Sequence, residues 1–277
     1  MRLGFMNVKD MRALPFEEVA KWGAENGFAA VDARLEGIDV CHEIGIEVGA
    51  THITGDLQSV EGDDLKQAQE EKTGMIDQAV SKGVTRGMIL HRRLPGISTE
   101  ESIERFAQGW GPIAEYAEER GFRLVMEIYH GHGSWLAVTP ELIRAVFEAV
   151  PSKGLGICLD PSHFVVQGID YLKATREFGD RIYYAHAKDT EILDDELYEY
   201  GIFGQALGTD RPFAGWWRYR LPGYGQIDWR RFLATLVEVG YDDVLAVEHE
   251  DPIWYGSVEL NKKGLLLAKR YLEPMII

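Results

Sequence analysis

Short apolar runs alternate with longer segments of mixed polarity along the whole chain. The runs have the length of buried strands, and most of the intervals between them are long enough to hold a helix. The shortest interval that must still do so lies near Ile38 to Ile44. We therefore predict eight strands, at about residues 2–7, 29–34, 47–53, 86–91, 123–129, 156–160, 182–187 and 243–249.

Capping signals at the ends of the intervals support this pattern. Ser98 to Glu101 has the spacing of a capping box, and Thr139 precedes a proline that would take the first helical position. At the other end of a helix, glycine takes the left-handed conformation without steric cost. The glycines predicted to do so, each just before an apolar run, are Gly27, Gly83, Gly121, Gly154 and Gly240.

The alternation of strands and helices predicts an α/β fold with a parallel sheet. Eight such units in roughly 250 residues match the (β/α)₈ TIM barrel, and an open, doubly wound sheet is the rival. Polar side chains end at least four consecutive strands, which favours the barrel because there they face one central mouth. No linker or shift in composition divides the sequence, so we predict a single domain over residues 1–277.

A long insertion separates the seventh and eighth predicted strands. It runs from about residue 190 to 226 and is rich in Asp, Glu, Tyr and Trp. A loop of that length in a compact domain is usually a lid or a substrate-binding segment. Its Trp216 and Trp217 could stack on a sugar, but exposed paired aromatics often mark an interface. We favour the interface, and with it a homo-oligomer.

The charge and the first residues exclude several kinds of partner. The 277 residues include 45 acidic and 29 basic side chains, for a formal net charge of −16, so we expect no nucleic acid partner. Too few apolar residues open the chain for a signal peptide or a membrane span, which predicts a cytoplasmic protein. Cys41 and Cys158 lie far apart in the sequence, and no disulfide is expected.

Acidic and imidazole side chains stand at the carboxyl ends of four predicted strands. They are Glu127, Asp160, His186 and Glu248. Because side chains alternate along a strand, all four can point into one mouth. Three carboxylates there would repel one another unless a cation compensated them, and a divalent metal ion is the simplest candidate. The alternative for any one of them alone is a helix cap or an ion pair.

The donor set narrows the choice of ion without deciding it. Three carboxylate oxygens and one imidazole nitrogen suit a borderline-hard cation such as Mn²⁺. Mg²⁺, Co²⁺, Fe²⁺ and Zn²⁺ remain alternatives.

Five fragments in the second half of the chain resemble a known family. They are Met126-Glu127, Leu159 to His163, His186-Ala-Lys-Asp189, Pro222 to Trp229 and Val247 to Asp251. Together with the eight-unit pattern they resemble the xylose isomerase-like barrels, in the sugar phosphate isomerase/epimerase group that includes D-tagatose/D-psicose 3-epimerases and inosose dehydratases. Each fragment alone is weak, whereas five in this order are fairly specific.

The resemblance implies roles for particular residues. Glu127, Asp160, His186 and Glu248 would hold one divalent metal ion, and the two glutamates would lie on opposite sides of a bound sugar to remove and return a proton. His163 would contact the substrate carbonyl or hydroxyl. The chemistry agrees, because a carboxylate can remove a proton next to a carbonyl only when the enediolate is stabilised, as a bound metal would do.

One departure bears on the substrate. The epimerases carry an arginine six residues beyond the metal-binding histidine, where this chain has Ile192. Arg218 or Arg220 from the insertion could replace it as substrate-binding residues. The missing arginine argues against a ketohexose substrate.

Other polar residues at the strand ends have two readings each. His52 and His91 end the third and fourth strands, where histidines help to bind zinc in endonuclease-IV-like nucleases. The Asp-x-His pair of that type is absent and the charge opposes a phosphate backbone, so we predict that they line a substrate pocket. His130 either contacts the substrate or faces solvent. Lys188 either contacts the substrate or pairs with an acid.

Three functions are consistent with these features. A metal-dependent isomerase or epimerase of a sugar or sugar derivative is the first, acting through an enediolate. A metal-dependent lyase or dehydratase of a keto-sugar, inosose or keto-glycoside is the second, because the same enediolate can expel a β-substituent. A non-enzymatic carbohydrate-binding barrel is the third, and loss of a ligand residue would have favoured it.

Overall fold

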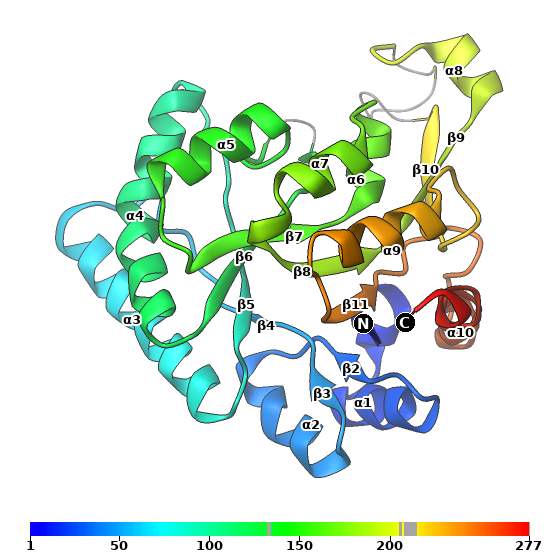
Figure 1. The fold of residues 1–277 in the computed structure, drawn as a ribbon, viewed down its shortest axis with the longest axis horizontal. Helices are drawn as coiled ribbons and strands as arrows, with labels where there is room; N and C mark the ends of the chain where they lie inside the picture. The colour runs from blue at the N-terminus through cyan, green and yellow to red at the C-terminus, as the bar shows by residue number, and fades with distance from the viewer. Residues whose placement is uncertain (132–133, 205–206, 208–214, 277) are drawn as a thin grey trace.

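The strands form a nearly closed parallel barrel surrounded by helices (Figure 1). The computed structural model describes residues 1–131, 134–204, 207 and 215–276. All neighbouring strands of the main sheet pair in parallel, in the order β3-β2-β1-β11-β8-β7-β6-β5-β4. These strands are β1 (Arg2–Phe5), β2 (Ala30–Val31), β3 (Glu47–Val48), β4 (Thr51–His52), β5 (Arg86–Ile89), β6 (Arg123–Glu127), β7 (Leu155–Leu159), β8 (Ile182–Ala187) and β11 (Val244–Val247).

The two ends of the sheet meet inside one short stretch of chain. β3 pairs with β2 and β4 pairs with β5, yet only Gly49 and Ala50 separate them. A Cβ atom on Gly49 would lie 2.3 Å from the Tyr184 hydroxyl, so glycine is required where the barrel interior is this crowded. β3 and β4 together form the predicted third strand, and the predicted eight-stranded barrel is confirmed.

Helices cover the outside of the barrel (Figure 1). The predicted caps are present, since Ser98 Oγ accepts from Glu101 N at 3.0 Å and Thr139 Oγ1 accepts from Leu142 N at 3.3 Å. The short interval near Ile38 does hold a helix. The outer helices are α1 (Phe16–Glu25), α2 (Ile38–Ile44), α3 (Gly62–Ser81), α4 (Thr99–Glu119), α5 (Pro140–Ala149), α6 (Pro161–Val166), α7 (Tyr171–Glu177), α9 (Trp229–Glu238) and α10 (Val258–Leu272).

The junction glycines behave as predicted with one exception. Gly27, Gly83, Gly121 and Gly240 have φ angles of 74°, 74°, 66° and 84°. Gly154 has no positive φ, and the prediction of a left-handed cap there is wrong. Glycine is required at this position for close packing, because a Cβ atom would lie 1.9 Å from the Ala114 carbonyl oxygen of α4.

Two apolar clusters divide the core at the barrel wall. The larger one packs the strands against the helices, as in other α/β barrels. The smaller one draws residues from different strands, as expected of alternate side chains pointing into the barrel. Its buried members are Ala30, Ala50, Met88, Val125, Cys158, Tyr184, Val244 and Ala246. Both cysteines are buried free thiols, as predicted.

The insertion contains regular structure, which corrects the expectation of a loop. β8 leads through Lys188 into β9 (Asp189–Ile192), and β9 pairs antiparallel with β10 (Trp217–Arg220). The short helix α8 (Asp194–Tyr200) follows β9. Together they project from the barrel at the upper right of Figure 1. We call β9 and β10 the ribbon.

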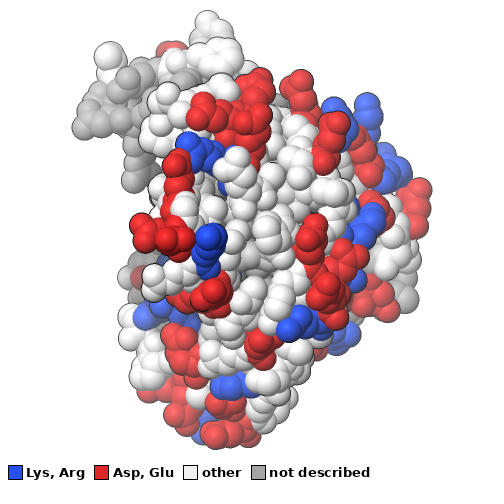
Figure 2. Space-filling view, turned by 90° about the vertical axis from the view of Figure 1, so that its left-hand side faces the viewer, with Lys and Arg blue, Asp and Glu red and all other residues white. Residues whose placement is uncertain are grey.

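Charged side chains of both signs are spread over the surface. On the face that Figure 2 presents, acidic and basic side chains are interspersed. Among the described residues, no helix is both long and apolar enough to cross a membrane.

Close packing of α4 gives a test of the fold. A Cβ atom on Gly109 would lie 2.8 Å from Leu57 Cβ and from the Leu57 carbonyl oxygen. We expect Gly109→Ala to lower the free energy of unfolding by about 1–3 kcal/mol, because the loop after β4 must move. Gly74→Ala, in α3 with nothing within 4 Å, is the control and should raise stability by up to about 1 kcal/mol. Denaturant unfolding measures both, and equal effects would contradict the packing argument.

Candidate active site

Four strand ends bring their polar side chains together at the mouth of the barrel. Glu127 is the last residue of β6, Asp160 follows β7, His186 lies in β8 and Glu248 follows β11. One ligand atom from each lies within 4.8 Å of the others. The structure thus unites the four residues predicted from the sequence, and it forms a candidate site for a divalent metal ion.

His186 stands between the two glutamates. Its Nδ1 lies 3.1 Å from Glu127 Oε1 and 3.2 Å from Glu248 Oε2, and the ring is fully buried. Burial alone would raise the pKa of Glu127, but the imidazoles of His163 and His186 hold it well below its usual range. Glu127 is therefore ionised, as both a metal ligand and a general base must be.

Lys188 supplies one positive charge to this cluster. Its buried ammonium lies 2.7 Å from Glu248, 3.1 Å from Asp160 and 3.4 Å from Glu250. Burial would lower the pKa of Lys188, but the acids around it raise the pKa well above its usual value. Glu250 also pairs with Lys9, at 2.6 Å. The three carboxylates among the four candidate ligands still outnumber the Lys188 ammonium, so the site retains the negative charge and the hard donors that a divalent cation needs.

His163 faces the carboxylates and is held from behind by Tyr219. Its Nε2 lies 3.4 Å from Asp160 Oδ2, and its Nδ1 lies 2.9 Å from the Tyr219 hydroxyl. His130 Nε2 lies 3.1 Å from the same hydroxyl. When Tyr219 donates to His163 Nδ1 and accepts from His130, His163 carries its proton on Nε2, toward the carboxylates. His163 is then a proton donor aimed into the site.

The ribbon delivers Tyr219, a residue that the sequence analysis missed. Side chains alternate along β10, so Trp217 and Tyr219 share the face that contacts His130. Arg218 and Arg220 lie on the other face. Arg218 Nε bonds Glu191 at 2.6 Å, and Arg220 pairs with both Glu191 and Asp251. The two-residue alternation within Trp217 to Arg220 was the available signal, because it places Tyr219 on the same face as Trp217.

The two tryptophans do not form an exposed pair. Trp216 is 6% exposed within a single chain, and Trp217 packs on His130 and Tyr219 with ring centroids 5.3 and 4.8 Å away. The reading of these residues as an exposed interface is therefore wrong. The homo-oligomer that rested on them stays a prediction.

Asp189 connects two of the five family-like fragments, His186 to Asp189 and Pro222 to Trp229. Its buried carboxylate accepts from Thr190 N, Gly223 N, Ile227 N and the Trp229 indole, at 2.8, 3.0, 3.1 and 2.8 Å. Three of these donors, from Gly223, Ile227 and Trp229, belong to the segment Pro222 to Trp229. One carboxylate thus fixes the return of the chain from the ribbon to α9 and keeps β10 beside the mouth.

His91 and His52 line the floor of a cavity beside Glu127. This cavity has a volume of about 150 Å³. His91 Nε2 lies 2.6 Å from the Glu127 carbonyl oxygen, and its Nδ1 accepts from Ala137 N. Burial lowers the pKa of His91 to about 4, so the ring is neutral. Both of its nitrogens bond the backbone, and it positions Glu127, while the half-buried His52 faces the cavity.

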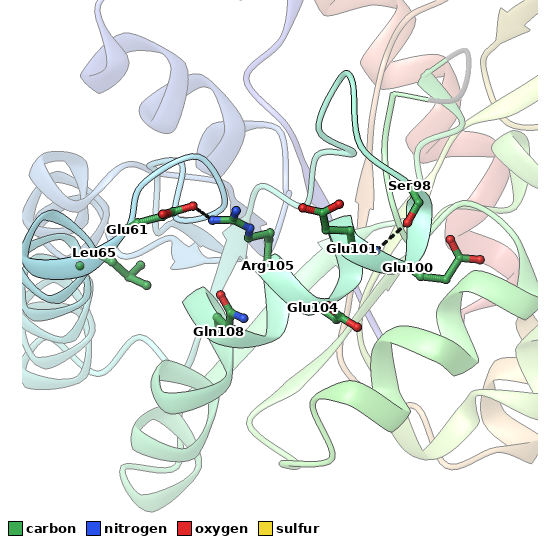
Figure 3. Close-up of a pocket in the computed structure, with 9 residues that line it drawn as sticks. Glu61, Leu65, Ser98, Glu100, Glu101, Glu104, Arg105 and Gln108 are labelled. Atoms are coloured by element: carbon green, nitrogen blue, oxygen red, sulfur yellow. Dashed lines mark hydrogen bonds and ion pairs between the residues drawn. The ribbon is translucent and has the colours of Figure 1, made fainter.

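Another hollow of about 630 Å³ lies between α3 and α4, away from the strand ends (Figure 3). Arg105 points across it to an ion pair with Glu61, and exposed glutamates line its rim. It includes none of the residues at the barrel mouth.

The sequence matches the family model described as "Xylose isomerase-like TIM barrel" over residues 10–271. The chain belongs to the xylose isomerase-like TIM barrel family. This membership agrees with the resemblance found in the five fragments and with the parallel barrel.

Relatives within and near this family include sugar-modifying enzymes. An inosose dehydratase of Lacticaseibacillus casei is 30% identical over 179 residues, 63% of this chain and 55% of that protein. The match thus spans about half the length of this curated relative. A D-psicose 3-epimerase of Clostridium cellulolyticum H10, solved with D-tagatose, has a TM-score of 0.75 at 14% identity, covering 100% and 99% of the chains.

A third relative carries a metal. The IOLI protein with a bound zinc atom has a TM-score of 0.74 at 18% identity, and the alignment covers 100% of this chain and 98% of that one. At such identities the two structures establish the fold alone.

Metal binding by the four side chains can be measured with a matched pair of variants. We expect Glu248→Gln to weaken Mn²⁺ binding at least about tenfold, because an anionic ligand is lost. Glu250→Gln removes the same charge two residues later, where the carboxylate contacts Lys188 but is no ligand, and should bind nearly as well as wild type. Titration of metal-stripped protein with Mn²⁺, followed by electron paramagnetic resonance, gives both affinities. Equal affinities in the two variants would refute the assignment.

Proposed function

We propose that the protein is a divalent-metal-dependent lyase that removes water or a related β-substituent from a keto-sugar or an inosose. The observation that carries this proposal is the combination of two ionisable glutamates with a proton-donating pair, His163 and Tyr219, at one mouth. The 30% identity to an inosose dehydratase supports the same class of reaction.

The four side chains at the strand ends would hold the ion. When bound, it would polarise the substrate carbonyl and stabilise the negative charge of the enediolate. Glu127 or Glu248 takes the proton from the carbon next to the carbonyl, and the C–H electron pair becomes the new C=C bond. Both carboxylates lie about 3.2 Å from His186 Nδ1, so the three side chains would converge on the same ion and the carboxylates would be held for this step.

The leaving group needs a proton as its C–O bond breaks. His163 Nε2 lies on the site side of the ring, and Tyr219 bonds the far nitrogen. His163 can donate its Nε2 proton to the departing oxygen, while the Tyr219 hydroxyl keeps its own proton, bonds Nδ1 and holds the ring in this orientation. The products are an unsaturated keto compound and water, or an alcohol when the β-substituent is a glycosyl group.

A second candidate is an isomerase or epimerase that returns a proton to the same intermediate. The observation in its favour is the placement of the two glutamates, which reach His186 from β6 and β11 with β7 and β8 between these strands. A substrate between them would meet a base on each face. Ile192 in place of the epimerases' arginine disfavours a ketohexose for this candidate.

Solvent deuterium separates the two candidates. Metal-stripped protein, with and without Mn²⁺, is incubated in D₂O with keto-sugars, inososes and 3-keto-glycosides and followed by proton NMR. We expect unsaturated products only when Mn²⁺ is added, and none with Glu127→Gln, which lacks one of the two candidate bases and a candidate metal ligand. Deuterium incorporation with the carbon skeleton and hydroxyls retained would instead establish the isomerase. Turnover without metal, or no reaction at all, would refute both.

The role of Tyr219 has its own test. Tyr219→Phe keeps the ring but removes the hydroxyl that bonds His163, so we expect kcat for elimination to fall by roughly a hundredfold. Tyr198→Phe is the control, because Tyr198 lies on α8 and is 87% exposed. Elimination kinetics measure both variants, and proton exchange at the α-carbon should survive in Tyr219→Phe. Unchanged kcat would contradict the proposed donor.

A further inference from the structure

A second cavity adjoins the candidate metal site on the side of the first strands. Its volume is about 510 Å³, and Met6, His52 and Thr54 line both this cavity and the small cavity that reaches Glu127. We call the second cavity the arginine lobe. Because they share a wall, a substrate bound at the metal site can extend into the arginine lobe.

Two arginines from separate loops converge on this lobe. Arg12 lies in the short helical turn Lys9–Ala13 that follows β1, and Arg34 comes shortly after β2. Arg12 uses its Nε to bond the Asn7 carbonyl oxygen at 3.0 Å, and its two terminal nitrogens have no partner among the described residues. Arg34 makes no hydrogen bond or ion pair with any described residue. Both guanidinium groups therefore have donors available for a ligand.

The two arginines act electrostatically on His52, which lies in the wall shared by the two cavities. Burial lowers the pKa of His52, and Arg34 and Arg12 lower it further, while Asp32 and Glu127 act in the opposite direction. His52 thus lies within the field of both guanidinium groups and of the metal-site carboxylate. The lobe therefore brings two guanidinium groups to one side of the shared wall, while Glu127 lies on the other.

Two acids also line the lobe, and among the described residues neither forms an ion pair with Arg12 or Arg34. Asp32 is buried and turns Oδ1 to the Tyr184 hydroxyl at 2.5 Å and to Ala50 N at 3.1 Å. Within the described part of the chain its Oδ2 has no hydrogen-bond partner, and it can accept from a substrate hydroxyl. Glu36 is exposed and forms no ion pair with Arg34 among the described residues.

We propose that the arginine lobe binds an anionic oxyacid group of the substrate, a carboxylate or a phosphate, at the end remote from the metal. Paired guanidinium groups recognise the oxygens of such groups with charge-assisted hydrogen bonds. The substrate is then an acidic keto-sugar derivative, with hydroxyls for Asp32 in between. This inference rests on the proposed function, since it assigns the second end of the same substrate.

Binding of charge-matched polyols tests the lobe without any turnover. Isothermal titration of Mn²⁺-loaded protein compares D-glucitol, D-gluconate and D-glucitol 6-phosphate, which share a chain length and differ in the terminal group. We expect at least one anion to bind about tenfold more tightly than D-glucitol. The preferred anion distinguishes a carboxylate subsite from a phosphate subsite.

Substitutions of the two arginines test whether the preference for an anion comes from the arginine lobe. Arg12→Gln and Arg34→Gln should each reduce the preference for the anion and leave the affinity for D-glucitol unchanged, whereas the exposed Arg230→Gln on α9 should keep the preference. Three results would refute anion binding by the arginine lobe. They are equal binding of all three polyols, no binding of either anion, and a preference for the anion that survives in both arginine variants. If anion binding is refuted but the protein still catalyses metal-dependent elimination from neutral keto-sugars, the proposed function is retained. If no substrate undergoes elimination, the proposed function itself is refuted.

Discussion

The crowding of carboxylates at one mouth is the constraint on which the site depends. A parallel barrel turns every strand's carboxyl end toward the same opening, so acids that are far apart in sequence become neighbours. Their mutual repulsion and burial would raise their pKa values unless cations stood among them. Lys188 supplies one such charge, His186 and His163 supply hydrogen bonds, and a divalent ion suits the remaining donors.

The ribbon is held to this mouth by buried acids that take no part in the cluster. Asp189 collects four donors from β9, the returning segment and α9, and Asp251 accepts from Arg220 Nε and Leu221 N at 2.9 and 3.1 Å. Hydrogen bonds to a buried carboxylate are among the stronger ones in proteins. They fix β10 so that Tyr219 meets His163, and they connect the insertion to the chemistry.

The cavity system has two chemically distinct ends. Acids and a histidine gather at the carboxyl ends of β6, β7, β8 and β11, while the guanidinium groups of Arg12 and Arg34 lie after β1 and β2. His52 and Thr54 stand between the two ends. A substrate with a carbonyl at one end and an anionic group at the other would be oriented by charge before any specific contact formed.

The sequence by itself determined the barrel, most of its predicted caps and the four strand-end residues, because the strand and helix pattern recurs eight times and capping depends on neighbouring residues. It did not determine that β9 and β10 pair, that Trp216 is buried, or that Gly154 is required by Ala114, since each depends on a distant part of the chain. The same holds for Tyr219 and for the pairing of Arg220 with Asp251. Only tertiary packing decides which of two alternating faces meets the site, because local periodicity defines the faces of a strand and not their neighbours.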